Sequence, residues 1–562
     1  MITPQVNQIL AFARDICLPA FYFQDSLRDS SISAKSSRDV TNPSGWISSP
    51  AARRGWQQVV DALSDKCTAL ACLSTYLALM AACQINPTKA TEASLKMRAG
   101  SSALLRQQLL RQDSSNSTVK ARQELLWQVF WHFYAEFFAG NLEAAQIHGK
   151  MLRQSCEAAE EGVITPHFLD SVLFVDTHMS AKYMTRTVFD IDKWIPDVFA
   201  PIWEKIDPDM ANITQEDGST LHATIKCDPL RSIFLRTRQS IILLRQSAES
   251  HSVDIDYDTL FYWLNSHAYV DGGRVIDLYL MLIDKALHAP KVKPDPSRPP
   301  RPIPIGTETA GYLYTEACLC LCSLYSIRDV GQEIPINGID IVDASSTIGQ
   351  HLRESIIQAL TSCTPEERKT YRPAHLWCAY IGALMEQREA DPSSRTRTTS
   401  LSDVTKVKAE PTLRRAATVS DAPASSTFSA GGRDPSMMPF NSLLAEVAHS
   451  MVLLSWQQVA DMLKQFIYTD TAEPHGSRWF WKTMGAYLDR RKRFMEQKQR
   501  QQATQAQRDP SVLEKQRSNE SDKSSFSRSS TGQVYMASPR RWSTAGGTQV
   551  PRLTKGKTMP NR

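Results

Sequence analysis

Apolar residues recur along most of this chain at the three- and four-residue spacing of amphipathic helices. The strict alternation of apolar and polar residues that indicates strands hardly appears. The helical pattern begins near Arg54, after an apolar entry over residues 1–24 and a polar stretch from Ser26 to Ser49 that predicts a loop or disorder. We therefore expect an all-α protein, built as an array of antiparallel helices.

The densest apolar stretch, Arg122–Gly140, predicts a central helix that is buried on nearly all sides. It carries ten large apolar side chains, most of them aromatic. A Gly-Asn pair then ends the helix, and Leu142–Gln154 predicts the returning helix of a hairpin. Asp258–Asn265 and Arg274–His288 predict a second pair of helices, and Gly311–Arg328 predicts a single one.

Two capping boxes mark helix starts in the second half of the chain. Thr364 is followed three residues later by Glu367, and Ser455 by Gln458. A loop is expected between Pro290 and Pro304, which holds seven prolines.

Composition divides the chain into five parts. The content of apolar residues falls sharply at residue 389 and recovers at residue 440, so we expect a disordered insertion between helices of one domain. The parts are an N-terminal segment that is partly disordered (1–53), a helical domain (54–388), the insertion (389–439), helices that complete the domain (440–495) and a disordered basic tail (496–562).

The net charge of +5 is distributed unevenly. Asp489–Arg562 holds 17 Lys and Arg against 6 Asp and Glu, a net of +11, whereas the remaining residues hold 47 against 53, a net of −6. A basic arm suits an acidic partner such as nucleic acid, an import receptor or an anionic membrane. A solvated disordered tail is the alternative interpretation.

Cysteine usage and hydropathy indicate a soluble intracellular protein. Eleven cysteines, an odd number, lie in apolar contexts of a chain too large to need disulfides, which is typical of a reducing compartment. The N-terminus lacks the basic start of a signal peptide. The uncharged stretch Cys67–Cys83 is shorter than a typical membrane span and rich in Ala, so it predicts a buried helix and no membrane association.

No catalytic or cofactor motif is recognisable. The sequence contains no phosphate-binding loop, dinucleotide fingerprint, Gly-x-Ser-x-Gly elbow or His-Glu-x-x-His pair. Cys318, Cys320 and Cys322 alternate along an apolar helix, where residues two apart point roughly 200° from each other, so they cannot jointly bind one ion. We expect no enzyme activity, no cofactor and no metal.

The basic block Arg490, Arg491, Lys492 and Arg493 is a candidate nuclear import signal at the end of a predicted helix. The alternative is a solvated helix terminus whose cations complement the helix dipole. Candidate modification sites lie in the stretches expected to be disordered, within tetrads of the kind joined to ubiquitin-like proteins or in kinase contexts; they are Lys408, Thr418, Ser538 and Ser543.

Four segments resemble the regulatory domain that is specific to fungal transcription factors. They are "FAGNLEAAQIHGKMLRQ" within Leu125–Gln154, "DPLRSIFLRTRQSIILL" (Asp228–Leu244), "RPAHLWCAYIGALMEQR" (Arg372–Arg388) and "SWQQVADMLKQFIYTDTAEPHGSRWFWKTM" (Ser455–Met484). In many fungal regulators this domain lies C-terminal to a zinc binuclear cluster. The resemblance covers roughly Arg54–Arg388 and Phe440–Arg493.

The resemblance implies a nuclear transcription regulator that controls a metabolic or secondary-metabolite gene set. It also implies a homo- or heterodimer, with the transcription machinery or another regulator as partner. This chain departs from the family because only Cys17 precedes Cys67, so six cysteines cannot form the zinc cluster here. We therefore expect DNA binding to be weak or indirect, and a helical co-regulator or scaffold that never binds DNA is the alternative.

Overall fold

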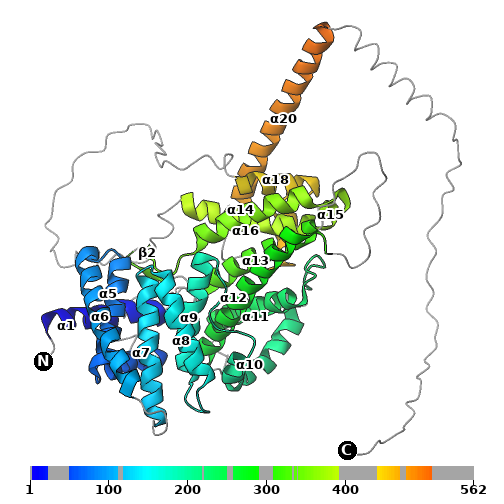
Figure 1. The fold of residues 1–562 in the computed structure, drawn as a ribbon. Helices are drawn as coiled ribbons and strands as arrows, with labels where there is room; N and C mark the ends of the chain where they lie inside the picture. Colours follow the sequence, from blue (N-terminus) through cyan, green and yellow to red (C-terminus); the bar gives the residue numbers. More distant parts are fainter. Residues whose placement is uncertain are drawn as a thin grey trace, which may run out of the picture. The chain divides into compact units, whose positions relative to one another are not determined.

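The computed structural model describes residues 3–22, 50–111, 118–217, 220–249, 257–289, 308–331, 334–337, 339–390, 439–468 and 476–508 (Figure 1). The chain divides into two units, Met1–Leu488 and Asp489–Arg562. The expectation of an all-α protein is confirmed, because within the described ranges the strands are limited to β1 (Pro335–Ile336) and β2 (Ile339–Asp340). These form one antiparallel pair in which Ile336 lies opposite Ile339.

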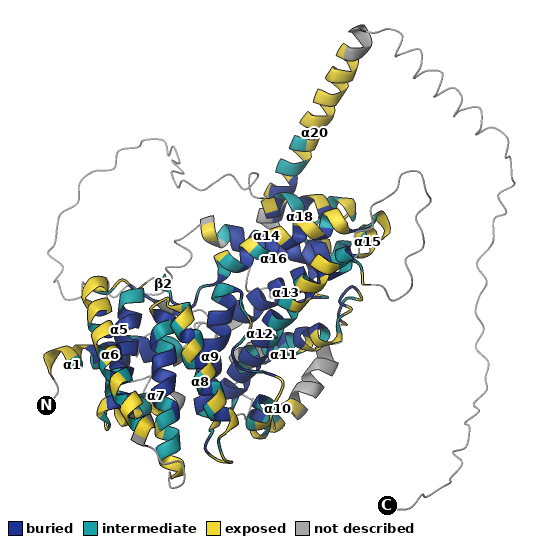
Figure 2. Cartoon of the chain, viewed as in Figure 1, coloured by how far each residue is buried: buried dark blue, intermediate teal, exposed yellow. Residues whose placement is uncertain are grey.

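The first hydrophobic core is built by the N-terminal helices, whose buried faces appear dark in Figure 2. These helices are α1 (Pro4–Phe12), a π-helical turn η1 (Ala13–Cys17), α2 (Leu18–Tyr22), α4 (Pro50–Ala62), α5 (Lys66–Ala82), α6 (Pro87–Arg111), α7 (Val119–Phe138), α8 (Leu142–Glu157) and α9 (Pro166–Tyr183).

A second hydrophobic core lies among the later helices. They are α11 (Asp228–Glu249), α12 (Tyr257–His288), α13 (Ala310–Gly331), α14 (Ser345–Ser362), α15 (Pro365–Thr370), α16 (Arg372–Ala390), α18 (Pro439–Ser450), α19 (Trp456–Leu463) and α20 (Gly476–Arg508). Helix α10 (Ile195–Asp217) contributes Ile195 and Phe199 to the first core. Helices α9 and α12 pack against each other and contribute buried residues to both cores, so they join them.

The predicted central hairpin is present as α7 and α8. Thr118 caps α7, since its hydroxyl accepts a hydrogen bond from the Ala121 backbone N–H, and Asn141 caps α8 in the same way. Gly140 lies between them with a φ of +71°, a left-handed conformation that glycine adopts without strain. Both predicted capping boxes, at Thr364 and Ser455, are also confirmed. The uncharged stretch expected to be a buried helix is α5.

The second predicted pair of helices is wrong, because Asp258–Asn265 and Arg274–His288 belong to one continuous helix, α12. The glycines between them serve packing. A Cβ on Gly272 would lie 3.0 Å from Thr177 Cγ2 of α9, and a Cβ on Gly273 would lie 3.0 Å from Ile191 Cγ1. The two glycines therefore let α12 approach its neighbours closely without interrupting the helix.

Helices α16 and α18 pack together although 48 residues separate them in sequence. The Glu386 carboxylate accepts hydrogen bonds from the Phe440 backbone N–H at 3.2 and 3.4 Å. The Phe440 ring occupies the space that a Cβ on Gly382 would need. Most of the insertion that the sequence predicts at 389–439 lies outside the described residues. The predicted proline loop at 290–304 also lies outside them.

Helix α20 runs to Arg508, so the predicted start of a disordered tail at residue 496 is wrong for its first thirteen residues. Residues 494–508 contain Glu, Gln, Lys, Ala and Arg, which favour helix, and lack Gly and Pro. Low sequence complexity therefore misled the prediction. The remainder of the tail, 509–562, lies outside the described residues.

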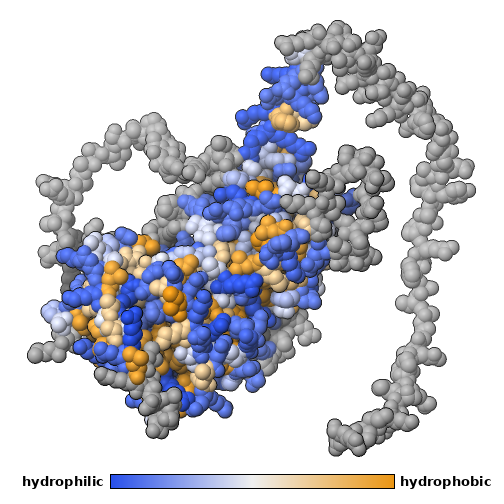
Figure 3. Space-filling view, in the orientation of Figure 1, coloured by the Kyte–Doolittle hydropathy of each residue, from blue (hydrophilic) through white to orange (hydrophobic). Residues whose placement is uncertain are grey.

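The surface carries the mixture of side chains that is normal for a globular protein. Apolar residues appear in small groups among polar ones in Figure 3, and exposed examples are Val60, Leu95 and Ile147. Among the helices that are described, none is long and apolar enough to cross a membrane.

Candidate functional site

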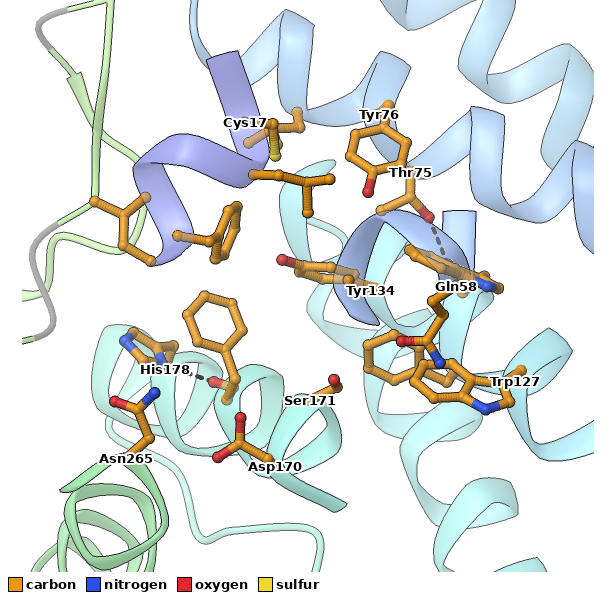
Figure 4. Close-up of a pocket in the computed structure, with 18 of the residues that line it drawn as sticks. Cys17, Gln58, Thr75, Tyr76, Trp127, Tyr134, Asp170, Ser171, His178 and Asn265 are labelled. Atoms are coloured by element: carbon orange, nitrogen blue, oxygen red, sulfur yellow. Dashed lines mark hydrogen bonds between the residues drawn. The ribbon is translucent and has the colours of Figure 1, made fainter. Parts of the chain in front are cut away.

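A pocket with a cavity volume of about 90 Å³, partly open to solvent, lies among the helices of the first core. Its wall comes from seven helical elements and one residue beside the β-pair (Figure 4). The lining residues are Cys17, Leu18, Phe21, Gly55, Gln58, Thr75, Tyr76, Leu79, Trp127, Phe130, Trp131, Tyr134, Asp170, Ser171, Phe174, His178, Phe261, Asn265, Tyr269 and Ile334.

Aromatic rings form much of this wall. Helix α7 contributes Trp127, Phe130, Trp131 and Tyr134, whose spacing of three and four residues places them on one face. Tyr134 is also one of three rings that contact one another edge to face, at centroid distances of 5.2–6.5 Å and angles of 65–78°; the other two are Phe21 of α2 and Phe174 of α9. These contacts fix the orientation of the rings.

Helix α9 supplies the polar groups of the pocket. Asp170, Ser171, Phe174 and His178 line it from one face of the helix. His178 is fully buried, and its Nδ1 lies 2.6 Å from the Phe174 carbonyl oxygen. A carbonyl oxygen only accepts, so Nδ1 carries the proton and Nε2 presents a lone pair. Nε2 has no hydrogen-bond partner among the residues that the structure describes. Burial holds the pKa of His178 well below 6.5, so the ring is neutral.

Asp170 is the second polar group without a full set of partners. Only 9% of its surface is exposed, and Oδ1 has no hydrogen-bond partner. Burial raises the pKa of Asp170 from 3.8 to about 8, and no neighbouring cation offsets this shift. Asp176 lies two turns further along α9 and differs, because its carboxylate accepts hydrogen bonds from the Val188 and Phe189 backbone N–H groups at 2.8 and 2.9 Å. Asp176 therefore has a structural role, whereas no comparable partner is found for Asp170 Oδ1 among the described residues.

One edge of the pocket is closed by a chain of hydrogen bonds that links three helices. Arg54 Nε donates to the Tyr262 hydroxyl at 3.2 Å, and that hydroxyl lies 3.1 Å from His167 Nδ1. His167 Nε2 lies 2.8 Å from Gln58 Oε1. Burial lowers the pKa of His167 to about 4, so the ring is neutral. The Tyr262 hydroxyl therefore donates to Nδ1, and Nε2–H donates to Gln58 Oε1. The hydrogen bonds thus run in one direction, from α4 through α12 and α9 back to α4.

The described residues of the pocket form no recognisable nucleophilic or metal-binding arrangement. The Ser171 hydroxyl donates to the His167 carbonyl at 3.0 Å, so it is not paired with a basic side chain as a nucleophile would be. Burial raises the pKa of the Cys17 thiol well above 9.0, which keeps it protonated and unreactive. Among the described residues, no three His, Cys, Asp or Glu side chains are grouped as a metal ion would require.

The site residues named from the sequence lie elsewhere. Arg490–Arg493 are part of α20, where Arg490 is half-buried and the next three are exposed; the block lies within the helix, not at its end as expected, because α20 continues to Arg508. Cys318, Cys320 and Cys322 are buried in α13, as expected of hydrophobic filler. The modification candidates fall outside the described residues; they are Lys408, Thr418, Ser538 and Ser543.

Sequence reasoning missed the pocket. Its lining residues come from positions between 17 and 334, and no local motif connects them. One signal was available: Asp170 and Asp176 lie in a stretch of α9 that is rich in large apolar residues, Phe168–Met179. Acidic residues on a helix that is apolar nearly all round are seldom buried without a partner or a function.

The segments that resemble the fungal regulatory domain form helices of the first unit. Residues 125–154 lie in α7 and α8, residues 228–244 in α11, residues 372–388 in α16, and residues 455–484 include α19 and the start of α20. Comparison of the chain with family models, curated proteins and solved structures finds no match.

Proposed function

We propose that this chain is a transcription regulator whose helical body responds to a small molecule bound in the pocket. The observation that supports this proposal is the pocket itself, which combines an aromatic wall with two buried polar atoms that lack partners, Asp170 Oδ1 and His178 Nε2. Buried polar groups without partners are costly unless a ligand satisfies them. Pockets with a few convergent polar groups in an apolar lining are typical of small-molecule sites.

The regulatory assignment is supported by the resemblance to the fungal transcription factor domain. The segments that carry it are packing segments of an all-helical body, which fits a domain that senses and transmits a signal. The proposed regulator controls a metabolic or secondary-metabolite gene set in the nucleus, as a homo- or heterodimer with another regulator or the transcription machinery. The basic excess of Asp489–Arg562 suits an import receptor or nucleic acid.

A helical pair that joins two cores offers a route from the pocket to the rest of the body. Asp170 and His178 lie on α9, and Asn265 and Tyr269 lie on α12. Both helices extend into the second core. A ligand that fixes the pocket ends of α9 and α12 would therefore bias their packing in the second core, provided that it binds one arrangement better than another.

The second candidate function is a helical co-regulator or scaffold that does not bind DNA itself. It is favoured by the cysteine distribution, since only Cys17 precedes Cys67 and the family's zinc cluster cannot form from these residues. Both candidates use the same helical body, so the test must separate transcriptional output from DNA contact.

The experiment fuses the full chain to a heterologous DNA-binding domain and measures a reporter gene in a fungal host. We expect reporter output that Ser171→Phe alters, because Ser171 lines the pocket and a phenyl group would fill it. The control is Ile147→Phe, which places a phenyl group at an exposed position on α8. Output that equals that of the DNA-binding domain alone under all growth conditions contradicts the regulatory proposal.

Recruitment by the unfused chain separates the two candidates. A regulator that reaches DNA through a partner will be enriched at discrete promoters in a chromatin precipitation experiment. A scaffold without a role on DNA gives uniform background while still altering the tethered reporter.

A further inference from the structure

We propose that the pocket binds a small organic cation, an ammonium or quaternary ammonium group on an apolar body, with Asp170 as its counterion. This inference rests on the proposed function in one respect, since the bound cation would be the effector. The physical argument concerns the pocket alone and starts from Asp170.

Asp170 is a buried carboxyl for which the protein supplies no compensation. Its Oδ1 has no hydrogen-bond partner, and no ion pair to it is found among the described residues. Two other poorly exposed acids are paired with arginine: Asp271 with Arg236 at 2.6 Å, and Glu136 with Arg98 at 2.5 Å. Burial of a carboxylate without a cation is energetically unfavourable. Folding has already removed most of the water around Asp170, so a cationic ligand would pair with this carboxylate without the cost of desolvating it.

The aromatic wall favours a cation over a neutral molecule of the same shape. The faces of aromatic rings are negative, and a cation within about 6 Å of a ring centroid gains roughly 2 kcal/mol when the site is desolvated. Phe21, Tyr134 and Phe174 contact one another at steep angles, so their faces point in different directions along the wall. Rings set at steep angles beside an acidic group are the arrangement that recognises quaternary ammonium groups.

His178 adds an acceptor and no donor. Its Nδ1–H donates to the Phe174 carbonyl, and Nε2 has no partner among the described residues. The ring is fully buried, so a ligand reaches Nε2 only if neighbouring side chains move. A primary or secondary ammonium group, or a hydroxyl on the same molecule, could donate to it. The competing occupant is a neutral hydroxylated aromatic compound that donates to His178 and ignores the charge of Asp170.

The two occupants differ in how their affinity depends on pH. Burial raises the pKa of Asp170 to about 8 in the empty protein, so the carboxyl must lose a proton to pair with a cation. The affinity for a permanently charged ligand should rise up to tenfold for each pH unit below about 8 and level off above it. A neutral ligand produces no such rise.

The other titratable groups near Asp170 do not obscure this pH dependence of the affinity. The other titratable residues of the lining are Cys17, Tyr76, Tyr134, His178 and Tyr269, and those behind the wall are Arg54, His167, Tyr262 and Arg328. The pKa of His178 lies well below 6.5, that of His167 is about 4, and that of Cys17 lies well above 9.0. None of these three changes protonation between pH 6 and 8.

The experiment is equilibrium dialysis of the full chain against phenyltrimethylammonium and its neutral isostere tert-butylbenzene, at pH 6, 7, 8 and 9. We expect the cation to bind more tightly than the isostere, with an affinity that rises from pH 6 to 8. Asp170→Asn should weaken cation binding about tenfold or more and leave the isostere unaffected. Asp197→Asn, which removes an exposed carboxylate from α10, is the matched control.

The wild-type pH series needs no variant, so the inference remains testable if Asp170→Asn fails to fold. Equal affinity for the two probes, a cation affinity independent of pH, or no binding of either probe at millimolar concentration overturns the inference. Cation binding without any effect on the tethered reporter leaves the ligand class standing and contradicts the proposed function. A reporter that responds only to neutral compounds supports the proposed function and contradicts the cationic ligand.

Discussion

Burial raises the pKa of several carboxyl groups, and the shift is largest for three of them. Burial raises the pKa of Asp170 to about 8, and those of Asp176 and Glu316 to about 7. Each has a different set of partners: Asp176 accepts two backbone hydrogen bonds, and Glu316 accepts one from the Lys226 N–H through Oε1 while Oε2 has none. The folded protein therefore holds protons that the unfolded chain has already lost at pH 6.

This difference predicts how stability changes with pH. Between the unfolded pKa of Asp170 near 3.8 and its folded value of about 8, the folded state binds more protons, so the free energy of unfolding falls as pH rises. Asp170→Asn removes this contribution and should make the decline shallower, by up to about 1.4 kcal/mol per pH unit. Urea unfolding from pH 5 to 9 measures it.

Asp197→Asn serves as the control for that comparison, because the exposed carboxylate on α10 has little reason to change the slope. Identical slopes for wild type and Asp170→Asn would show that the carboxyl of Asp170 is hydrated or paired in solution. That result would also remove the basis for a cation site.

At the scale of helices, glycines set the distances between neighbours. The Phe440 ring of α18 lies where a Cβ on Gly382 of α16 would be, whereas nothing lies within 4 Å of the corresponding position at Gly485 of α20. Both glycines are inside helices, so the same substitution tests packing at one position and helix propensity at the other.

Gly382→Ala should destabilise the protein by about 1–3 kcal/mol, because the added methyl group forces the Phe440 ring or α18 to move. Gly485→Ala should be neutral or stabilising by up to about 1 kcal/mol, since Ala favours helix over Gly. Thermal unfolding of both variants gives the comparison. A Gly382→Ala protein as stable as wild type would mean that α16 and α18 are less closely packed than the contact indicates.

The same packing shows how far sequence patterns could lead. The α7–α8 hairpin and both capping boxes were predictable, since apolar spacing and N-cap chemistry act over a few residues. The break in α12 was predicted wrongly, because Gly272 and Gly273 accommodate Thr177 and Ile191, which are distant in sequence. The pocket was missed for the same reason, since Asp170 acquires its meaning only beside rings from other helices.

At the scale of the whole molecule, the proposed nuclear import signal Arg490–Arg493 leads to a prediction about localisation. Arg491, Lys492 and Arg493 are exposed on α20, so an import receptor can reach them. Alanine at Arg490–Arg493 should shift a fluorescent fusion of this 63.1 kDa chain from the nucleus to the cytoplasm, as passive entry of a protein of this size is slow. Alanine preserves helix, so the change removes charge and keeps the backbone of α20.

The control removes four exposed cations from the first unit instead; they are Lys89, Lys96, Arg106 and Lys150, each replaced by Ala. Fluorescence microscopy should find this control in the nucleus. Nuclear accumulation that survives the loss of Arg490–Arg493 would assign import to other basic residues or to a partner.

The contact between Glu386 and Phe440 bears on how this protein can change through evolution. Helices α16 and α18 are held by their own interface, so their packing depends on the residues of that interface. The candidate modification sites Lys408 and Thr418 lie outside the described residues, so selection on them can act separately from selection on the packing of the two helices.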